Sequence, residues 1–287
     1  HAYPDDFATV ALSMMCRRPV KFVADRIESF TSDIHARHHL VKARIAASKS
    51  GEILAFEMND LTGIGPYSMF PRTSAIEGNQ VVNLVGGPYK HQHYRARLQV
   101  VFQNKTPTCQ YRGVGHPIAC AVTEGLVDLA AQKLKMDPLE FRKRNVIHPG
   151  EVWGPGQIMD DGCLGAETCL DTIKDEYDAA VAAGKAVGLG LGLKNSGLGN
   201  GFREISKAAI HFRADGIVEV RHGWTEMGQG INTVALQVAV HELGIDPDKI
   251  RVIVDTTREL GFGQTTGSRG TLMGAGAVKA ACEAARA

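Results

Sequence analysis

The sequence predicts an α+β fold in two domains, with mixed sheets built on hairpins and covered by helices. A strand-like run at 41–49 is joined to another at 52–59 by a Ser-Gly pair, a two-residue turn that closes hairpins. A second hairpin is predicted within 208–221, where an Asp-Gly pair separates two apolar runs. Because hairpins are mixed with helices instead of alternating as strand, helix and strand, a doubly wound parallel sheet is not expected.

Local signals predict two consecutive helices in the first half of the chain. Apolar residues recur at near-helical spacing from Ile118 to Leu134, so a long amphipathic helix is expected directly after Pro117. A second helix is expected to start at Asp137, whose carboxylate can cap it, with Glu140 completing a capping box.

Other parts of the chain have weaker patterns. A buried helix is predicted at 6–15 and an apolar strand at 19–24, whereas 64–94 is rich in Gly, Pro and Tyr and is expected to be an irregular connection. A linker-like stretch places the predicted domain boundary near residue 150, which gives domains 1–149 and 150–287.

Composition excludes several classes of function. The chain has 287 residues, 44% hydrophobic and 22% charged, with 32 Lys and Arg against 31 Asp and Glu. Such a balanced charge gives no field that would attract nucleic acid or an anionic membrane, so a small-molecule substrate is expected. No apolar run is long enough to span a bilayer and no secretory leader begins the chain, so we expect a cytoplasmic location.

The cysteines and the chain ends allow two further predictions, one about metal clusters and one about the length of the parent protein. None of the six cysteines forms a C-x-x-C pair, so no zinc or iron–sulfur cluster is expected within this sequence. The chain opens at His1 without Met and stops within a helical pattern at Ala287, so it is interpreted as a fragment of a longer polypeptide.

Three glycine-bearing segments share one design, a strand-like run followed by a loop of Gly and polar residues and then a helix. They lie at 111–117 (loop 1), 225–230 (loop 2) and 265–271 (loop 3). Backbone N–H groups at helix starts bind phosphates and other anions well, so each loop is expected to offer such donors. Together the loops are expected to converge around one large, phosphate-bearing ligand.

A fourth glycine-rich segment, at 188–192, superficially resembles a nucleotide-binding sequence. It lacks the G-x-G-x-x-G spacing and the strand–helix–strand context of a dinucleotide site. Leu193 stands where a P-loop needs Gly before Lys194. The run is therefore interpreted as a strand under close packing. A nucleotide-binding enzyme that uses 188–201 is kept as a minor hypothesis.

The residues of the three loops resemble those of one known family. Tyr-Arg-Gly-x-Gly-x-Pro at 111–117 with Glu124 beyond it, Thr-Glu-Met-Gly-Gln-Gly at 225–230 and Thr-Thr-Gly-Ser-Arg-Gly-Thr at 265–271 occur in the order found in molybdenum hydroxylases. The opening His-Ala-Tyr-Pro-Asp-Asp and the Arg-Pro-Val-Lys at 18–21 fit as well. The chain thus resembles the molybdopterin-binding large subunit of the xanthine dehydrogenase and aldehyde oxidase family over nearly its whole length.

The resemblance implies roles for individual residues. Arg112 would be catalytic, and both Arg112 and Gly267 would lie beside the molybdenum without ligating it directly. Substrate contacts would come from Val114 and, by a weaker alignment, from Leu198. The cofactor would be bound by residues of all three loops: Gly113, Gly115, Gly228, Gln229, Gly230, Thr266, Gly267, Ser268 and Thr271.

The resemblance also implies the chemistry and the partners. Family members hydroxylate an electron-poor carbon with oxygen from water, using molybdenum held by a molybdopterin that often carries a cytosine dinucleotide. Iron–sulfur clusters and FAD would lie on other subunits or domains, together with the rest of the large subunit. The family's Phe-Gly loop should precede His1 and its catalytic Glu should follow Ala287, so the fragment alone is expected to be inactive. Val114 and Leu198 replace the aromatic residues of purine-oxidising members, which leaves aldehydes and N-heterocycles as candidate substrates.

Each candidate residue also has a plainer interpretation. Arg112 could pair with Glu124 or Asp128, and Gln229 could only cap its own loop. Glu226 is expected to have a structural role, whereas Arg269 is as well explained as a solvated charge. Three histidines are expected to form a solvated or packed face and not a metal site: His35, His38 and His39. For the whole protein, the second hypothesis is a non-catalytic scaffold subunit that keeps the fold without metal.

Overall fold

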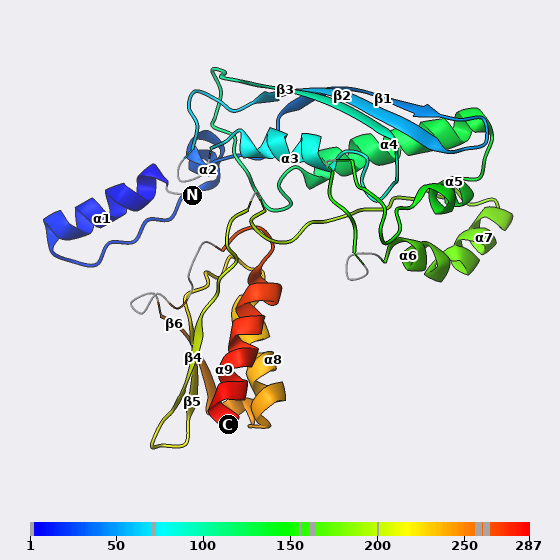
Figure 1. Cartoon of the computed structure of the whole chain (residues 1–287). Helices are drawn as coiled ribbons and strands as arrows, with labels where there is room; N and C mark the ends of the chain where they lie inside the picture. Colours follow the sequence, from blue (N-terminus) through cyan, green and yellow to red (C-terminus); the bar gives the residue numbers. More distant parts are fainter. Residues whose placement is uncertain are drawn as a thin grey trace. The chain divides into compact units, whose positions relative to one another are not determined.

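The computed structural model describes residues 3–69, 73–154, 156–160, 165–199, 201–255, 260 and 265–287. The chain forms two compact units, of which unit 1 ends at Leu193 and unit 2 begins at Lys194 (Figure 1). Both units combine helices with a three-stranded mixed sheet, so the predicted α+β fold is confirmed.

The sheet of unit 1 contains β1 (His39–Ala47), β2 (Ile53–Gly63) and β3 (His93–Val101). β1 pairs with β2 in antiparallel fashion and β3 joins β2 in parallel, which gives the order β1-β2-β3. The antiparallel pair is the hairpin predicted from its Ser-Gly turn. The hairpin forms where predicted because its turn and its alternating strands are specified locally.

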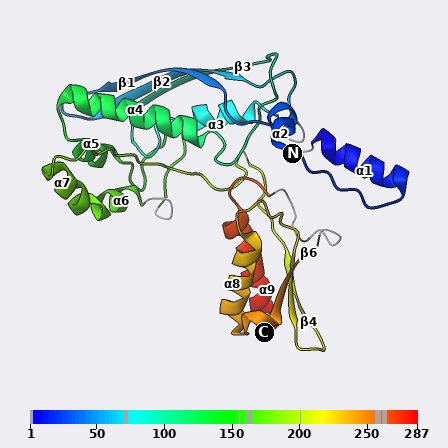
Figure 2. The ribbon, with the colours of Figure 1, turned by 180° about the vertical axis from the view of Figure 1, so that it is seen from behind.

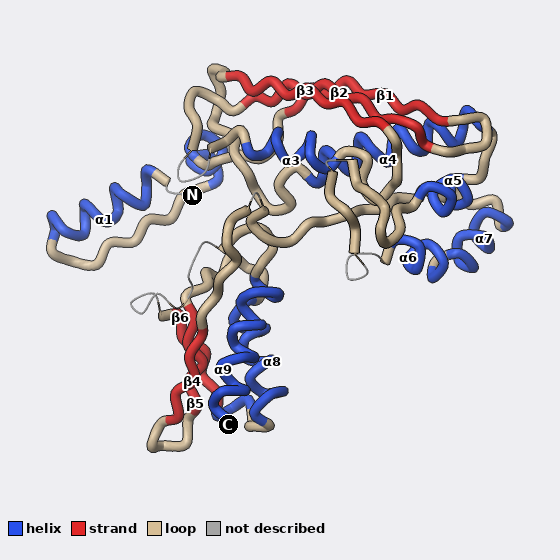
Figure 3. The backbone as a smooth tube through the Cα atoms, in the orientation of Figure 1, coloured by secondary structure: helices blue, strands red, loops and turns tan. Residues whose placement is uncertain are grey.

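Two helices cover one face of this sheet: α3 (Ile76–Leu84) lies against β2 and β3, and α4 (His116–Leu134) lies against β1 (Figure 3). The core between the layers is apolar, with Phe56, Met58 and Val127 almost fully buried. α4 follows Pro117 as predicted. α3, in contrast, forms within the stretch that was expected to be irregular, because its short apolar repeat is buried against the sheet.

α5 (Pro138–Asn145) begins as predicted. Asp137 caps it, because its carboxylate accepts hydrogen bonds from the N–H groups of Leu139 and Glu140, both at 2.9 Å. The predicted capping box is wrong in its second half. Glu140 forms an ion pair with Arg144 one turn later, at 3.0 Å.

The segment after α5 stays with unit 1. α6 (Ala166–Thr172) and α7 (Lys174–Ala182) bury Leu170 and Tyr177 in the core of unit 1, and Leu189 and Leu191 pack on the same core. Because these side chains face the first core, compact unit 1 extends to Leu193. The division into cofactor-binding domains 1–149 and 150–287 stays a prediction.

Two predicted strands do not form. Residues 188–192 have no strand pairing, and a Cβ at any of the three glycines there would meet open space, so close packing does not explain the glycines. Residues 19–24 follow α1 (Pro4–Cys16) without strand pairing and lead to α2 (Arg26–Ser32). An apolar run becomes a strand only when a neighbouring strand takes up its backbone hydrogen bonds.

Unit 2 has a sheet of β4 (Ala208–Phe212), β5 (Val218–His222) and β6 (Ile250–Val254). β4 and β5 form the second predicted hairpin, and β6 joins β5 in parallel after the short 3₁₀ turn η1 (Pro247–Lys249).

α8 (Ile231–Leu243) and α9 (Gly276–Arg286) pack on one face of this sheet, as Figure 2 shows from behind. A π-helical segment, η2 (Gly270–Ala275), precedes α9. Apolar side chains from both layers form the buried core: Val218, Val220, Ala235, Ala239, Ile250, Val278 and Cys282. Within the described parts of both units, no helix is long and apolar enough to cross a membrane.

Candidate functional site

Loop 1 lies at the start of α4 in unit 1. Gly115 is the N-cap of α4 and has φ +72°, a conformation that L side chains rarely adopt. A Cβ at this position would lie 2.7 Å from the backbone nitrogen of Val81 and equally close to the carbonyl carbon of Gln80. Only glycine therefore allows loop 1 to lie this close to α3.

Two charged side chains hold the backbone of loop 1. The Arg37 Nη2 donates hydrogen bonds to the carbonyl oxygens of Tyr111, at 3.0 Å, and of Arg112. The Gly115 N–H donates to Glu77 Oε1 at 3.0 Å, and Arg37 Nε lies 3.1 Å from the same oxygen. The expectation that this amide is available to an anion is therefore wrong, because Glu77 already accepts its hydrogen bond.

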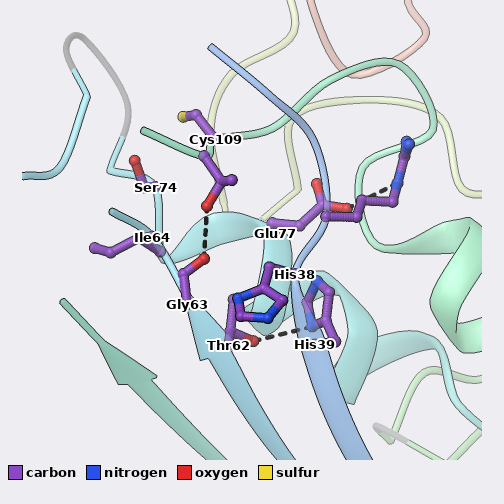
Figure 4. A pocket seen from close by; sticks show the side chains of 10 residues that line it. His38, His39, Thr62, Gly63, Ile64, Ser74, Glu77 and Cys109 are labelled. Carbon is purple, nitrogen blue, oxygen red and sulfur yellow. Dashed lines mark hydrogen bonds and ion pairs between the residues drawn. The ribbon is translucent and has the colours of Figure 1, made fainter. Parts of the chain in front are cut away.

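The environment of Glu77 is enclosed and polar. Arg37, Glu77, His38 and His39 line one small pocket, in which Figure 4 shows the Glu77 side chain. Burial raises the pKa of the Glu77 carboxyl, although the Gly115 N–H and Arg37 act in the opposite direction. The packed face predicted for the histidines is confirmed for His39, whose Nδ1 lies 2.9 Å from Asp60 Oδ2 in the interior.

Arg112 does not form the structural ion pair that was suggested for it. The carboxylates suggested as its partners, Glu124 and Asp128, are instead bonded to the buried Arg142, at 2.8 Å and 2.7 Å from its Nη2. Arg112 is exposed, and its guanidinium forms no ion pair with any residue that the structure describes. The plainer interpretation of Arg112 is therefore wrong, and the guanidinium can bind a ligand.

In loop 2, the carboxylate of Glu226 accepts hydrogen bonds from backbone N–H groups of the same loop. The Glu226 carboxylate accepts hydrogen bonds from the N–H groups of Gly228, at 2.7 Å, and Gly230, at 2.9 Å, at the start of α8. These donors, that of Gly230 above all, hold the pKa of Glu226 below its usual value. The structural role predicted for Glu226 is confirmed, and the expectation of free anion-binding amides at this helix start is wrong.

Gln229 is also engaged within loop 2. Its Nε2 donates to the carbonyl oxygen of Thr225 at 2.8 Å, and its Oε1 accepts from the N–H of Met227. Gln229 therefore caps its own loop, as the plainer interpretation predicts. A glutamine amide has two N–H donors and two lone pairs, so one donor and one acceptor position remain for a ligand.

Loop 3 differs because three of its amides have no acceptor within the described part of the chain. Gly267 has φ +67° and Ser268 has φ +55°, so successive N–H groups turn toward the same side and form a concave nest of donors. Among the described residues, no acceptor takes up the N–H groups of Gly267, Ser268 or Gly270. Of the three loops, loop 3 is the one that meets the anion-binding expectation.

A buried cation lies behind this nest. Arg269 is 1% exposed; its Nη1 lies 2.7 Å from Glu204 Oε2 and its guanidinium lies 5.3 Å from the centre of the Trp224 ring. Its Nε also donates to the carbonyl oxygen of Thr266. The interpretation of Arg269 as a solvated charge is therefore wrong, because the side chain anchors loop 3 from the interior.

Hydrogen bonds join the candidate segments of unit 2 to one another. The Thr225 N–H in loop 2 donates to Thr265 Oγ1 in loop 3 at 2.8 Å. The Gly197 N–H donates to the Gly267 carbonyl oxygen at 2.7 Å, which places the segment that carries Leu198 beside loop 3. A Cβ on Gly267 would lie 2.6 Å from the Gly197 carbonyl oxygen, so this contact also requires glycine.

Comparison with known proteins identifies the family. A family model described as a molybdopterin cofactor-binding domain matches residues 1–146, and a second model with the same description matches residues 166–287. The chain is a molybdopterin-binding member of the xanthine dehydrogenase family.

Relatives of this molybdopterin-binding chain include the 6-hydroxypseudooxynicotine dehydrogenase complex subunit gamma of Paenarthrobacter nicotinovorans, 30% identical over 97% of the chain and 37% of the relative. The aldehyde oxidoreductase of Megalodesulfovibrio gigas is 31% identical over 85% of the chain and 28% of the relative. The crystal structure of quinoline 2-oxidoreductase from Pseudomonas putida 86 superposes with a TM-score of 0.89 at 25% identity, over 100% of this chain and 39% of the other. The chain thus spans less than two fifths of the proteins that it matches.

The predicted catalytic, substrate-binding and cofactor-binding residues of this molybdopterin-binding chain fall into two groups. Gly228, Gln229, Gly230, Thr266, Gly267, Ser268 and Thr271 lie on the two connected loops of unit 2, near the segment of Leu198. Arg112, Gly113, Val114 and Gly115 lie on loop 1 of unit 1. Sequence reasoning missed Arg37 and Glu77, because Glu77 lies in the stretch thought to be irregular and no local pattern links it to Arg37.

One prediction concerns pH and the buried His222 at the end of β5. Its Nδ1 accepts a hydrogen bond from the Trp224 N–H at 3.1 Å, and burial lowers its pKa. A lowered pKa in the folded state means that His222 supports stability above about pH 6.5 and loses this contribution as pH falls below it, by at most about 1.4 kcal/mol per pH unit. We expect the free energy of unfolding to fall less between pH 7 and 5.5 in His222→Asn, which keeps an acceptor but does not titrate. Equal pH slopes for the two proteins would contradict this.

Proposed function

We propose that this chain is the molybdenum cofactor-binding portion of an oxidoreductase that hydroxylates an aldehyde or an N-heterocycle with oxygen derived from water. The observation that carries the proposal is the amide nest of loop 3, where the N–H groups of Gly267 and Ser268 have no acceptor among the residues described. Such nests bind phosphate groups, and molybdopterin carries one.

The surroundings of the nest favour an anion. Arg269 supplies a positive charge from the interior, although Glu204 offsets part of it. The hydroxyl groups of Ser268 and Thr271 are exposed at the same loop. Gln229 on the adjoining loop 2 has a remaining donor and acceptor that suit the heteroatoms of a pterin ring. These donors fit a phosphate-bearing pterin, in either its simple or its cytosine dinucleotide form.

Loop 1 is proposed to bind and orient the substrate. The bound molybdenum centre would supply the two-electron redox chemistry that the hydroxylation needs. The exposed guanidinium of Arg112 would bind and orient a substrate oxygen or nitrogen beside the metal, and Gly113 and Gly115 would let the loop backbone approach the cofactor. Val114 and, by the weaker alignment, Leu198 are the proposed substrate contacts. Gly267 would lie near the metal without ligating it.

The names of the relatives support a substrate class and an assembly of several subunits. One relative is named a nicotine 6-hydroxylase large subunit and another an aldehyde oxidoreductase, which supports an N-heterocycle or an aldehyde. Several are named as large or gamma subunits of complexes. We therefore propose that iron–sulfur clusters and FAD on partner subunits or domains remove the electrons, and that a carboxylate base comes from the remainder of the large subunit.

Gly267→Ala, made in the intact enzyme that contains this chain, tests the proposal. The added Cβ meets the Gly197 carbonyl oxygen and the backbone is in the left-handed region, so the nest should be distorted. We expect molybdenum and pterin per protein to fall by about 10-fold or more, which corresponds to about 1.4 kcal/mol of lost binding.

Gly276→Ala is the matched control, because Gly276 begins α9 with ordinary helical geometry and open space around it. This variant should keep its full cofactor content. Equal cofactor contents in the two variants would contradict the assignment of loop 3. The absence of molybdenum and pterin from the unmodified enzyme would favour a scaffold subunit without metal.

A further inference from the structure

Arg37 and Glu77 are two side chains outside the predicted motifs that meet at loop 1. Arg37 lies just before β1, whereas Glu77 lies in the first turn of α3. Arg37 has φ +71°, a left-handed conformation that is unfavourable for a residue with a Cβ. The chain therefore accepts local backbone strain at the residue whose guanidinium contacts loop 1.

The contacts of this pair lie on both sides of Val114 in loop 1. Arg37 bonds the carbonyl oxygens of Tyr111 and Arg112, and Glu77 bonds the N–H of Gly115. Glu77 Oε1 accepts from Gly115 while it also pairs with Arg37 Nε at 3.1 Å, so both ends of loop 1 are tied to one ion pair. Val114 and the base of the Arg112 side chain lie between these anchors.

Stability alone does not account for the pair. The Glu77 side chain is 4% exposed, and its Oε2 is buried without a hydrogen-bond partner among the residues described. Removing a carboxylate from water and leaving one oxygen unpaired offsets much of the attraction to Arg37, so a pair of this kind stabilises a fold only weakly. Its contacts instead fix the backbone of loop 1, to which the proposed function assigns the binding of substrate.

We propose that Arg37 and Glu77 are positioning residues that hold Arg112 and Val114 of loop 1 in the geometry required for turnover. The inference rests on the proposed function of loop 1. Displacement of a catalytic group by about 1 Å can lower a rate by about 100-fold, so anchors at both ends of a short loop can affect the rate strongly without contacting the substrate.

Arg37→Lys in the intact enzyme tests the inference. Lysine keeps a positive charge beside Glu77 but lacks the guanidinium fork that reaches two carbonyl oxygens while it pairs with the acid. We expect hydrogen exchange in the peptide 110–117 to become about 10-fold faster and kcat per bound molybdenum to fall about 10- to 100-fold, with cofactor content unchanged. Arg44→Lys is the matched control, because Arg44 is an exposed arginine of β1 paired with Glu57 and should leave both quantities unchanged.

A second variant, Glu77→Gln, keeps an oxygen that can accept from Gly115 but removes the charge that orients Arg37. It should give the same pattern as Arg37→Lys, with a smaller loss in kcat. If both variants lose cofactor or melt earlier while kcat per bound molybdenum stays at the wild-type value, the pair is only structural and the inference is overturned. Unchanged exchange in 110–117 would overturn it as well.

Arg112→Ala separates this inference from the proposed function. If Arg112→Ala turns over normally, the proposed role of loop 1 fails and the positioning role fails with it. If Arg112→Ala loses turnover whereas Arg37→Lys loosens loop 1 without lowering kcat, only the positioning inference fails.

Discussion

Arg112→Ala should lower kcat/KM of the intact enzyme by about 100- to 1,000-fold, the usual effect of removing one charged or polar donor that acts on the reacting groups. The guanidinium is exposed and forms no ion pair within the described residues, so its loss should not unfold unit 1. Molybdenum and pterin content should stay near the wild-type value, because the phosphate donors belong to loop 3. Steady-state kinetics with metal analysis measures both quantities.

Arg95→Ala is the control for this experiment. Arg95 is an exposed arginine on β3 whose nearest carboxylate, that of Glu57, lies 3.9 Å away. Its replacement removes the same charge without touching loop 1, and kcat/KM should be unchanged. Turnover at the wild-type rate in Arg112→Ala would refute the catalytic assignment, and loss of the cofactor in that variant would show that Arg112 binds it instead.

Arg142→Ala should destabilise unit 1 by about 3–5 kcal/mol, because it leaves a buried carboxylate without its partner. The Arg142 side chain is 0% exposed; it contacts Glu124 through Nε and Nη2, and its Nη2 also bonds Asp128 and the Leu189 carbonyl oxygen. Tyr89 donates from its hydroxyl group to the other oxygen of Glu124, at 2.7 Å. The network therefore ties α4, α5 and the extended segment around Leu189 together.

Arg144→Ala gives the matched comparison, since Arg144 lies two residues away on α5 with 38% of its side chain exposed, an ion pair to Glu140 and a hydrogen bond to the Ser50 carbonyl oxygen. An exposed pair of this kind contributes at most about 1 kcal/mol. Urea unfolding of both variants measures the difference. Similar losses in the two proteins would show that the buried network contributes no more than a surface pair.

The hairpins and the helix starts of the fold could be predicted, because short stretches of sequence specify them. The hairpin of β1 and β2 follows from its turn, and the starts of α4 and α5 follow from Pro117 and Asp137. α3 was missed because its nine residues lie among glycines and prolines that hide a short apolar repeat. The strand predicted at 19–24 does not form, since an apolar run needs a pairing strand that sequence alone does not supply.

For the candidate site, the sequence identified the glycine-bearing loops but not the groups that their amides contact. The glycines of the three loops were recognised, but helix starts were expected to leave their amides free. Two acids decide otherwise: Glu226 lies two residues before Gly228 and could have been recognised, whereas Glu77 is 38 residues from Gly115 and meets it only in the folded chain. Donors at loop 3 were expected from the sequence, but the shape of the nest was not, because it depends on the left-handed backbone of Ser268.

A structure of the intact enzyme with its molybdenum cofactor bound is the most direct test of the proposal that loops 2 and 3 form a pterin site. The account predicts a cofactor phosphate oxygen within about 3 Å of the Gly267 and Ser268 amide nitrogens, with the Gln229 amide beside the pterin. A cofactor held by other segments, with the loop 3 amides exposed to water, would contradict it.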